Sequence, residues 1–150
     1  MHPALEPLNA LIGEWNVEAS VDGQPVARSH MVSTWLDGEA FLVQRTHSEP
    51  PLPTTPQVWI DNNPLPATTI TGLDDAAGTF TQLYADARNV SRVYRLTLTD
   101  GALRIWRDAP GFNQRFTGTV TDTAITGAWE MSTDGTTWAK DFDLVYTKVI

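Results

Sequence analysis

The stretch SRVYRLTLTDGALRIWR, residues 91–107, decides the fold. Polar and apolar residues alternate on both sides of Asp100-Gly101, and this period of two is typical of half-buried β-strands. An Asp-Gly pair readily takes the positive φ angles that a tight hairpin turn requires. The stretch therefore predicts two antiparallel strands joined by a hairpin.

The same pattern extends outward through most of the chain. Three more Asp-Gly pairs separate strand-like runs: Asp22-Gly23, Asp37-Gly38 and Asp134-Gly135. Further strands are expected at 14–19, 27–36, 40–47, 57–60, 67–72, 79–85, 114–120, 124–131 and 137–148. Because connections this short cannot make parallel crossovers, the sheet is expected to be an up-and-down meander. Closure removes the exposed edges, so we expect an all-β antiparallel barrel of about ten strands with a ligand cavity, and a two-sheet sandwich is the alternative.

Two segments break the alternation. Leu5, Leu8 and Leu11 recur at three-residue spacing and predict a short N-terminal helix, or two short turns because Pro7 falls inside it. Residues 48–66 contain six prolines among nineteen residues and are expected to form a long loop or a pair of edge segments. Nothing else interrupts the pattern, so we expect a single domain over residues 1–150.

Composition excludes several classes of function. Eighteen acidic residues against ten basic ones give a net charge of −8, which argues against nucleic acid and anionic membranes as partners. The absence of cysteine excludes disulfides, thiolate metal sites and a cysteine nucleophile. Without cysteines or a signal-like start, the expected location is the cytoplasm, and a homodimer stays open. Asp141 and Asp143 share a strand face, but two carboxylates alone do not make a metal site.

The basic residues gather in one part of this acidic chain. Residues 86–115 hold six arginines and only three acids. We predict that Arg92 and Arg115 project into the barrel beside Tyr94 and Trp106, and that Glu130 compensates their charge. The alternative is that these arginines face solvent or pair structurally.

A second candidate group lies on the run 40–47. Arg45 and His47 share a strand face there, and a histidine beside an arginine could act as an acid–base group. The alternative is an ordinary strand end that leads into the proline-rich segment.

Several motifs resemble a family of uncharacterised, mainly actinobacterial proteins with a lipocalin-like (calycin) barrel. The motifs lie at Trp35–Arg45, Val90–Tyr94, Trp106–Gly118 and Trp129–Tyr146, and the resemblance that they carry extends over about two thirds of the chain. The resemblance implies a bacterial protein with a barrel fold and lends no activity.

A looser resemblance is to nitrobindin-type haem barrels, which begin with Gly-x-Trp-x-Gly-x-Gly. Gly13-Glu14-Trp15 keeps the first half of this element, whereas Val17 and Ala19 replace the later glycines. Those proteins ligate iron through a histidine near the C-terminus, but the last histidine here is His47. We therefore expect no haem and no other cofactor.

No recognisable catalytic motif is present, so the function is predicted from architecture. The first hypothesis is binding of a small hydrophobic or amphipathic ligand, including an anionic one, inside a barrel with aromatic walls. The six tryptophans that could line it are Trp15, Trp35, Trp59, Trp106, Trp129 and Trp138. The alternative is a small cavity enzyme of secondary metabolism, of the isomerase or cyclase type, which works by enclosing and orienting its substrate. The sequence does not decide whether the protein is an enzyme.

Overall fold

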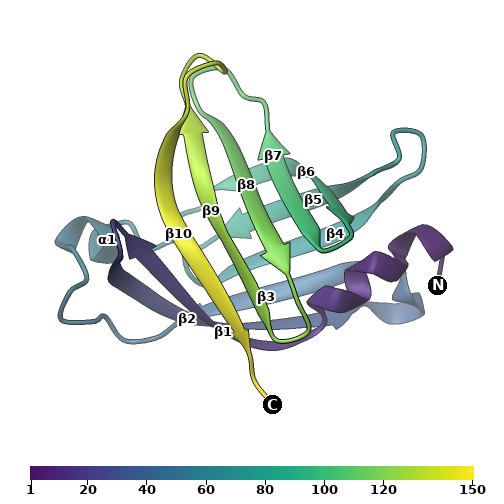
Figure 1. The fold of residues 1–150 in the computed structure, drawn as a ribbon, viewed down its shortest axis with the longest axis horizontal. Coiled ribbons are helices and arrows are strands. Elements are labelled where there is room, and N and C mark those ends of the chain that lie inside the picture. Colours follow the sequence, from purple (N-terminus) through teal and green to yellow (C-terminus); the bar gives the residue numbers. More distant parts are fainter.

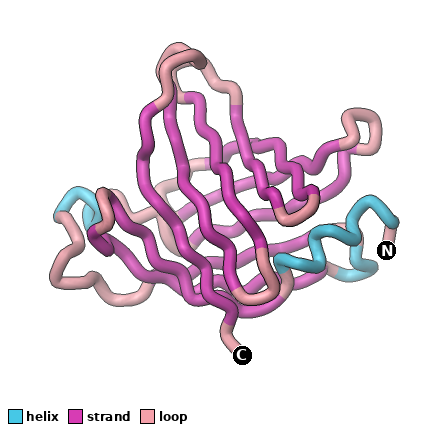
Figure 2. Tube along the Cα trace, in the orientation of Figure 1, coloured by secondary structure: helices cyan, strands magenta, loops and turns pink.

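Ten strands close into one antiparallel barrel, as the alternating pattern predicts. The computed structural model describes residues 1–150. The strands are β1 (Gly13–Val21), β2 (Gln24–Trp35), β3 (Leu42–Ser48), β4 (Ala67–Asp74), β5 (Thr79–Asp86), β6 (Ser91–Thr99), β7 (Ala102–Arg107), β8 (Asn113–Val120), β9 (Ala124–Ser132) and β10 (Ala139–Lys148). Each strand pairs with its neighbours in sequence, and β1 also pairs with β10 to close the barrel (Figures 1 and 2). The fold is all-β, and this closed architecture fits a calycin-like barrel.

Tight turns at Asp-Gly pairs make the short connections possible. Asp100 and Gly101 between β6 and β7 have φ angles of 51° and 77°, in the left-handed region that the turn requires. A Cβ atom at position 101 would lie 2.9 Å from the carbonyl oxygen of Val120, so glycine is also required sterically. The hairpin predicted from residues 91–107 is confirmed.

The N-terminal segment forms a 3₁₀ helix, η1 (Pro3–Leu11), that covers one end of the barrel. Pro7 lies inside it and lacks the N–H that a regular α-helix would need there. The leucines at positions 5, 8 and 11 are buried, and the Trp15 indole Nε1 donates a hydrogen bond to the Leu11 carbonyl oxygen at 3.0 Å. A short 3₁₀ helix, η2 (Asp37–Glu39), joins β2 to β3. None of the helices is both long enough and apolar enough to span a membrane.

The expected strand at 57–60 is wrong. These residues belong to the short helix α1 (Gln57–Asp61), which follows Pro56 and carries a hydrogen bond from Gln57 Nε2 to Asp61 Oδ1 of 2.9 Å. Because β3 and β4 pair directly with each other, the sheet has no free edge beside this segment. Trp59 instead packs edge-on against Phe142 of β10, with ring centroids 5.3 Å apart.

The interior of the barrel is largely filled, contrary to the expectation of a roomy central cavity. The pocket between η1 and the centre holds about 60 Å³, room for about two waters. The Phe116 ring occupies the centre because Gly118 and Gly127 face each other beneath it without side chains. Trp129 packs against the same ring at 5.5 Å.

Candidate functional site

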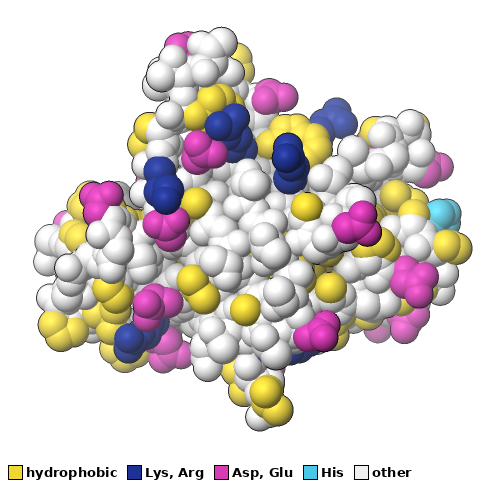
Figure 3. Space-filling model, in the orientation of Figure 1, with side chains coloured by type: hydrophobic (Ala, Val, Ile, Leu, Met, Phe, Trp, Pro, Cys, Tyr) yellow, Lys and Arg dark blue, Asp and Glu magenta, His cyan; other side chains and the backbone are white.

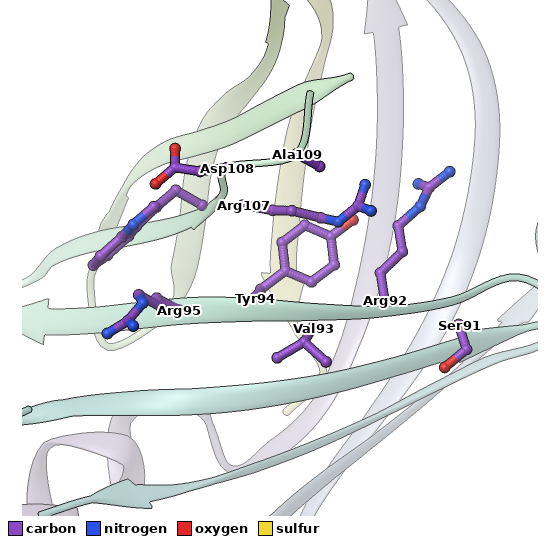
Figure 4. A pocket seen from close by; sticks show the side chains of 9 residues that line it. Ser91, Arg92, Val93, Tyr94, Arg95, Arg107, Asp108 and Ala109 are labelled. Atoms are coloured by element: carbon purple, nitrogen blue, oxygen red, sulfur yellow. The ribbon is translucent and has the colours of Figure 1, made fainter. Parts of the chain in front are cut away.

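The larger cavity lies in the barrel wall, where β6 and β7 separate. Their pairing ends at Arg95 and Trp106, while β6 continues along β5 as far as Ser91. The opening between the strands holds about 560 Å³. We call it the wall cavity, and it is lined by Ser91, Arg92, Val93, Tyr94, Arg95, Trp106, Arg107, Asp108 and Ala109 (Figure 4).

The separation has a local cause in the β7–β8 connection. The Phe112 amide donates to the Ala109 carbonyl oxygen at 3.0 Å, so the chain turns back on itself directly after β7. The buried Asn113 side chain accepts a hydrogen bond from the Ala109 amide at 2.8 Å and donates one to the Ser132 carbonyl oxygen at 3.1 Å. These contacts hold the connection against β9 and away from β6.

Alternation along the two strands gives the cavity an inner and an outer side. Arg92 and Tyr94 share the inward face of β6 with the buried Leu96. Arg107 shares the inward face of β7 with Ile105, which packs against the core. In Figure 4, Arg92 and Tyr94 point to one side of β6 and Val93 to the other, and the Arg107 side chain extends toward the hydroxyl end of Tyr94.

A shared acceptor holds the inner side together. The Tyr94 hydroxyl, on a side chain that is 4% exposed, donates to Gln114 Oε1 at 2.8 Å. Arg92 donates to the same oxygen at the longer distance of 3.4 Å, and its guanidinium lies 5.2 Å from the centre of the Phe112 ring. Because neither contact supplies a negative charge, the Arg92 charge is left uncompensated.

The wall cavity is positive although the protein as a whole is acidic. No carboxylate oxygen lies within 4.0 Å of a charged nitrogen of Arg92, Arg95 or Arg107. Asp108 is the one acidic residue of the lining. In the space-filling view most visible Lys and Arg side chains lie over the upper parts of β7 to β10, whereas Asp and Glu are spread across the whole face (Figure 3). The cavity can therefore attract an anionic group.

A compensated polar cluster lies beside the cavity, at the end of β5. The Tyr84 hydroxyl donates to Asp86 Oδ2 at 2.7 Å, and Arg88 donates to the same oxygen at 2.7 Å. Burial alone would raise the pKa of Asp86, but the hydrogen bonds from Arg88 and Tyr84 outweigh it and lower the pKa to about 2. Burial and, to a smaller extent, the hydrogen bond to Asp86 raise the pKa of Tyr84 above its usual value. The Tyr84 ring packs edge-on against Tyr94 at 6.1 Å, so the cluster supports the inner side of the cavity.

The prediction that Arg115 projects into the barrel is wrong. Its neighbours Gln114 and Phe116 occupy the inward face of β8, which turns Arg115 outward. On the outer surface it pairs with Glu130 at 3.0 Å and stacks on the Trp138 ring at 4.0 Å. The predicted residues thus divide: Arg92 and Tyr94 line the inner side of the wall cavity, whereas Arg115 and Glu130 lie outside it.

The other predicted site residues, Trp106, Arg45 and His47, lie on the outer faces of their strands. Trp106 lines the wall cavity, but from the outer face of β7. Arg45 and His47 lie exposed on the outer face of β3, and the structure does not bring them to the cavity.

The sequence reasoning missed two residues of this site, Arg107 and Gln114. A signal for both was present, because Arg107 shares a strand face with Ile105, and Gln114 shares one with Phe116. Once those apolar neighbours are assigned to the core, both polar side chains must point inward at the ends of their strands.

Comparison with known proteins supports the fold alone. No protein-family model matches the chain, and no curated protein matches it. Among solved structures, Rv2717c from M. tuberculosis is similar, with a TM-score of 0.61 and 14% sequence identity. The similarity covers 100% of this chain and 99% of that protein. The barrel is therefore an architecture shared with a bacterial protein, and at this identity no function follows from it.

Proposed function

We propose that the protein binds a small amphipathic ligand with an anionic group in the wall cavity. The observation that carries the proposal is the set of three arginines without carboxylate partners around an opening of about 560 Å³. Guanidinium groups hold carboxylate, sulfonate and phosphate oxygens through charge-assisted hydrogen bonds. The anionic group would lie between Arg92 and Arg107.

The neighbouring residues suit an amphipathic ligand. The Tyr94 hydroxyl donates to the neutral oxygen of Gln114, which an anion can replace as a stronger acceptor. Val93 and the Trp106 ring offer apolar contact on the outer side of the same opening. Pockets that combine apolar walls with a few polar anchors are typical of small-molecule sites.

The test compares two fluorescent probes that differ by one charge. Anilinonaphthalene sulfonate carries the anion, and phenylnaphthylamine is the same ring system without it. Arg92→Gln or Arg107→Gln should weaken binding of the sulfonate about tenfold, because each removes a charge-assisted hydrogen bond, while binding of the neutral probe changes little.

Arg104→Gln is the matched control. Arg104 lies exposed on the outer face of the same strand as Arg107, outside the cavity lining and with no ion pair. If all three variants weaken sulfonate binding equally, general charge attraction explains it and the wall cavity is not the site.

A further inference from the structure

The wall cavity exposes the edge of a β-strand as well as its arginines. In an antiparallel sheet, successive residues direct their backbone N–H and C=O groups alternately to the two neighbouring strands. The loop between β5 and β6 fixes this direction for β6, because the Asp86 amide donates to the Val90 carbonyl oxygen at 3.0 Å. The residues at 92 and 94 therefore bond to β5, and those at 91 and 93 face the opening.

The β6–β7 hairpin independently indicates that the backbone groups of residues 91 and 93 face the opening. Its two-residue turn makes Thr99 and Ala102 a hydrogen-bonded pair, which directs every odd-numbered residue of β6 toward β7. That pairing stops at Arg95. Ser91 and Val93 are exposed, and no backbone or side-chain hydrogen bond joins them to the chain beyond Arg107. Their four backbone polar groups form a free edge inside the wall cavity.

The side chains around this edge define what could pair with it. A segment lying antiparallel to Ser91–Tyr94 would place alternate side chains inward, toward Arg92 and Arg107, and outward, beside Val93. Val93 is 58% exposed and continues an apolar row across the outer sheet through Leu83 and Ile70, which are 51% and 37% exposed. Carboxylates suit the inward positions and aliphatic side chains suit the outward ones.

From this edge and its charge we infer that the ligand of the wall cavity is a short, extended, acidic peptide that pairs with β6 as an added strand. The inference rests on the proposed function, and it names the chemical class of the amphipathic anion. Backbone hydrogen bonds to Ser91 and Val93 would supply affinity for any extended chain, and the unpaired arginines would select alternating acidic side chains.

The test uses the peptide acetyl-Val-Glu-Val-Glu-amide, followed by NMR titration of the protein amides. We expect saturable shifts centred on Ser91 and Val93. Methylation of the valine nitrogens, which would face β6, should weaken binding at least about fivefold, because each removes one edge hydrogen bond. Methylation of the glutamate nitrogens, which would point away from β6, is the matched control and should weaken it less. Glutamine in place of glutamate should also weaken binding.

A protein variant isolates the edge from the arginines. In Val93→Pro the lost N–H is one that faces the opening, so pairing with β5 is preserved. This variant should lose peptide affinity at least about fivefold, whereas Val93→Ala, which keeps the backbone N–H, should lose less. If Val93→Pro does not fold, Ser91→Pro at the first residue of the strand gives the same readout.

The outcomes separate the two proposals. Sulfonate binding without peptide binding, or peptide binding that is indifferent to valine N-methylation, overturns the strand-pairing inference and leaves the proposed function intact. Failure of both the sulfonate and the peptide to bind overturns both. Peptide shifts centred away from β6 overturn the inference as well.

Discussion

The buried carboxylate of Asp86 should make the protein sensitive to acid, and the size of this effect follows from the structure. Its side chain is fully buried and accepts hydrogen bonds from Tyr84 and Arg88. Folding lowers its pKa from 3.8 to about 2. At 1.36 kcal/mol for each unit, the charged form contributes about 2 kcal/mol to the free energy of unfolding.

The sign of the pH dependence follows from the direction of the shift. Because the folded protein binds this proton less tightly than the unfolded chain, the contribution is complete above pH 3.8 and is lost as the pH falls toward 2. About half of it should be gone at pH 3. Asp86→Asn should therefore cost about 2 kcal/mol at pH 7, and its deficit relative to the wild type should shrink by about half at pH 3.

Urea unfolding at pH 7, 5 and 3, followed by tryptophan fluorescence, measures both quantities. Asp75→Asn is the control, because Asp75 is exposed in the β4–β5 loop and makes no hydrogen bond through its side chain. It should leave the free energy of unfolding unchanged at each pH. A deficit for Asp86→Asn that stays constant from pH 7 to pH 3 would refute the reasoning, because the loss would then come from packing and not from charge.

Three further substitutions test the packing and the site. Gly127→Ala should lower the free energy of unfolding by about 3 kcal/mol in the same assay, because its Cβ would lie 2.5 Å from the Thr117 carbonyl oxygen; a loss below 1 kcal/mol would contradict the arrangement. Glu130→Gln should cost about 1 kcal/mol or less, because its partner Arg115 is 40% exposed, and a larger loss would argue for a buried pair. Asn113→Ala should cost about 1–3 kcal/mol by leaving the Ala109 amide without its partner, and it should raise amide exchange in the β7–β8 connection; unchanged exchange would show that other contacts hold it.

The sequence by itself determined the strands and most of their connections. Alternation in a strand is a local property of the pleated backbone, and an Asp-Gly pair takes its turn conformation wherever it occurs. The hairpin at Asp100-Gly101 could therefore be predicted from its own residues. The strand prediction for residues 57–60 failed because their apolar residues fit a short strand or a short helix equally. Only the direct pairing of β3 with β4, which leaves no free edge beside this segment, decided between them.

Only the tertiary structure decided which face of each strand points inward and where the wall opens. A period of two places Arg115 and Phe116 on opposite faces of β8, but it does not say which of them belongs to the core. The fit of the Phe116 ring over Gly118 and Gly127, which lie on neighbouring strands, makes the Phe116 face the inner one. The wall cavity likewise depends on Asn113 holding a loop to β9. Strand formation is local, whereas the direction of each side chain and the position of the wall cavity depend on contacts between distant strands. This is why the sequence pointed to Arg92 and Tyr94 but missed Arg107.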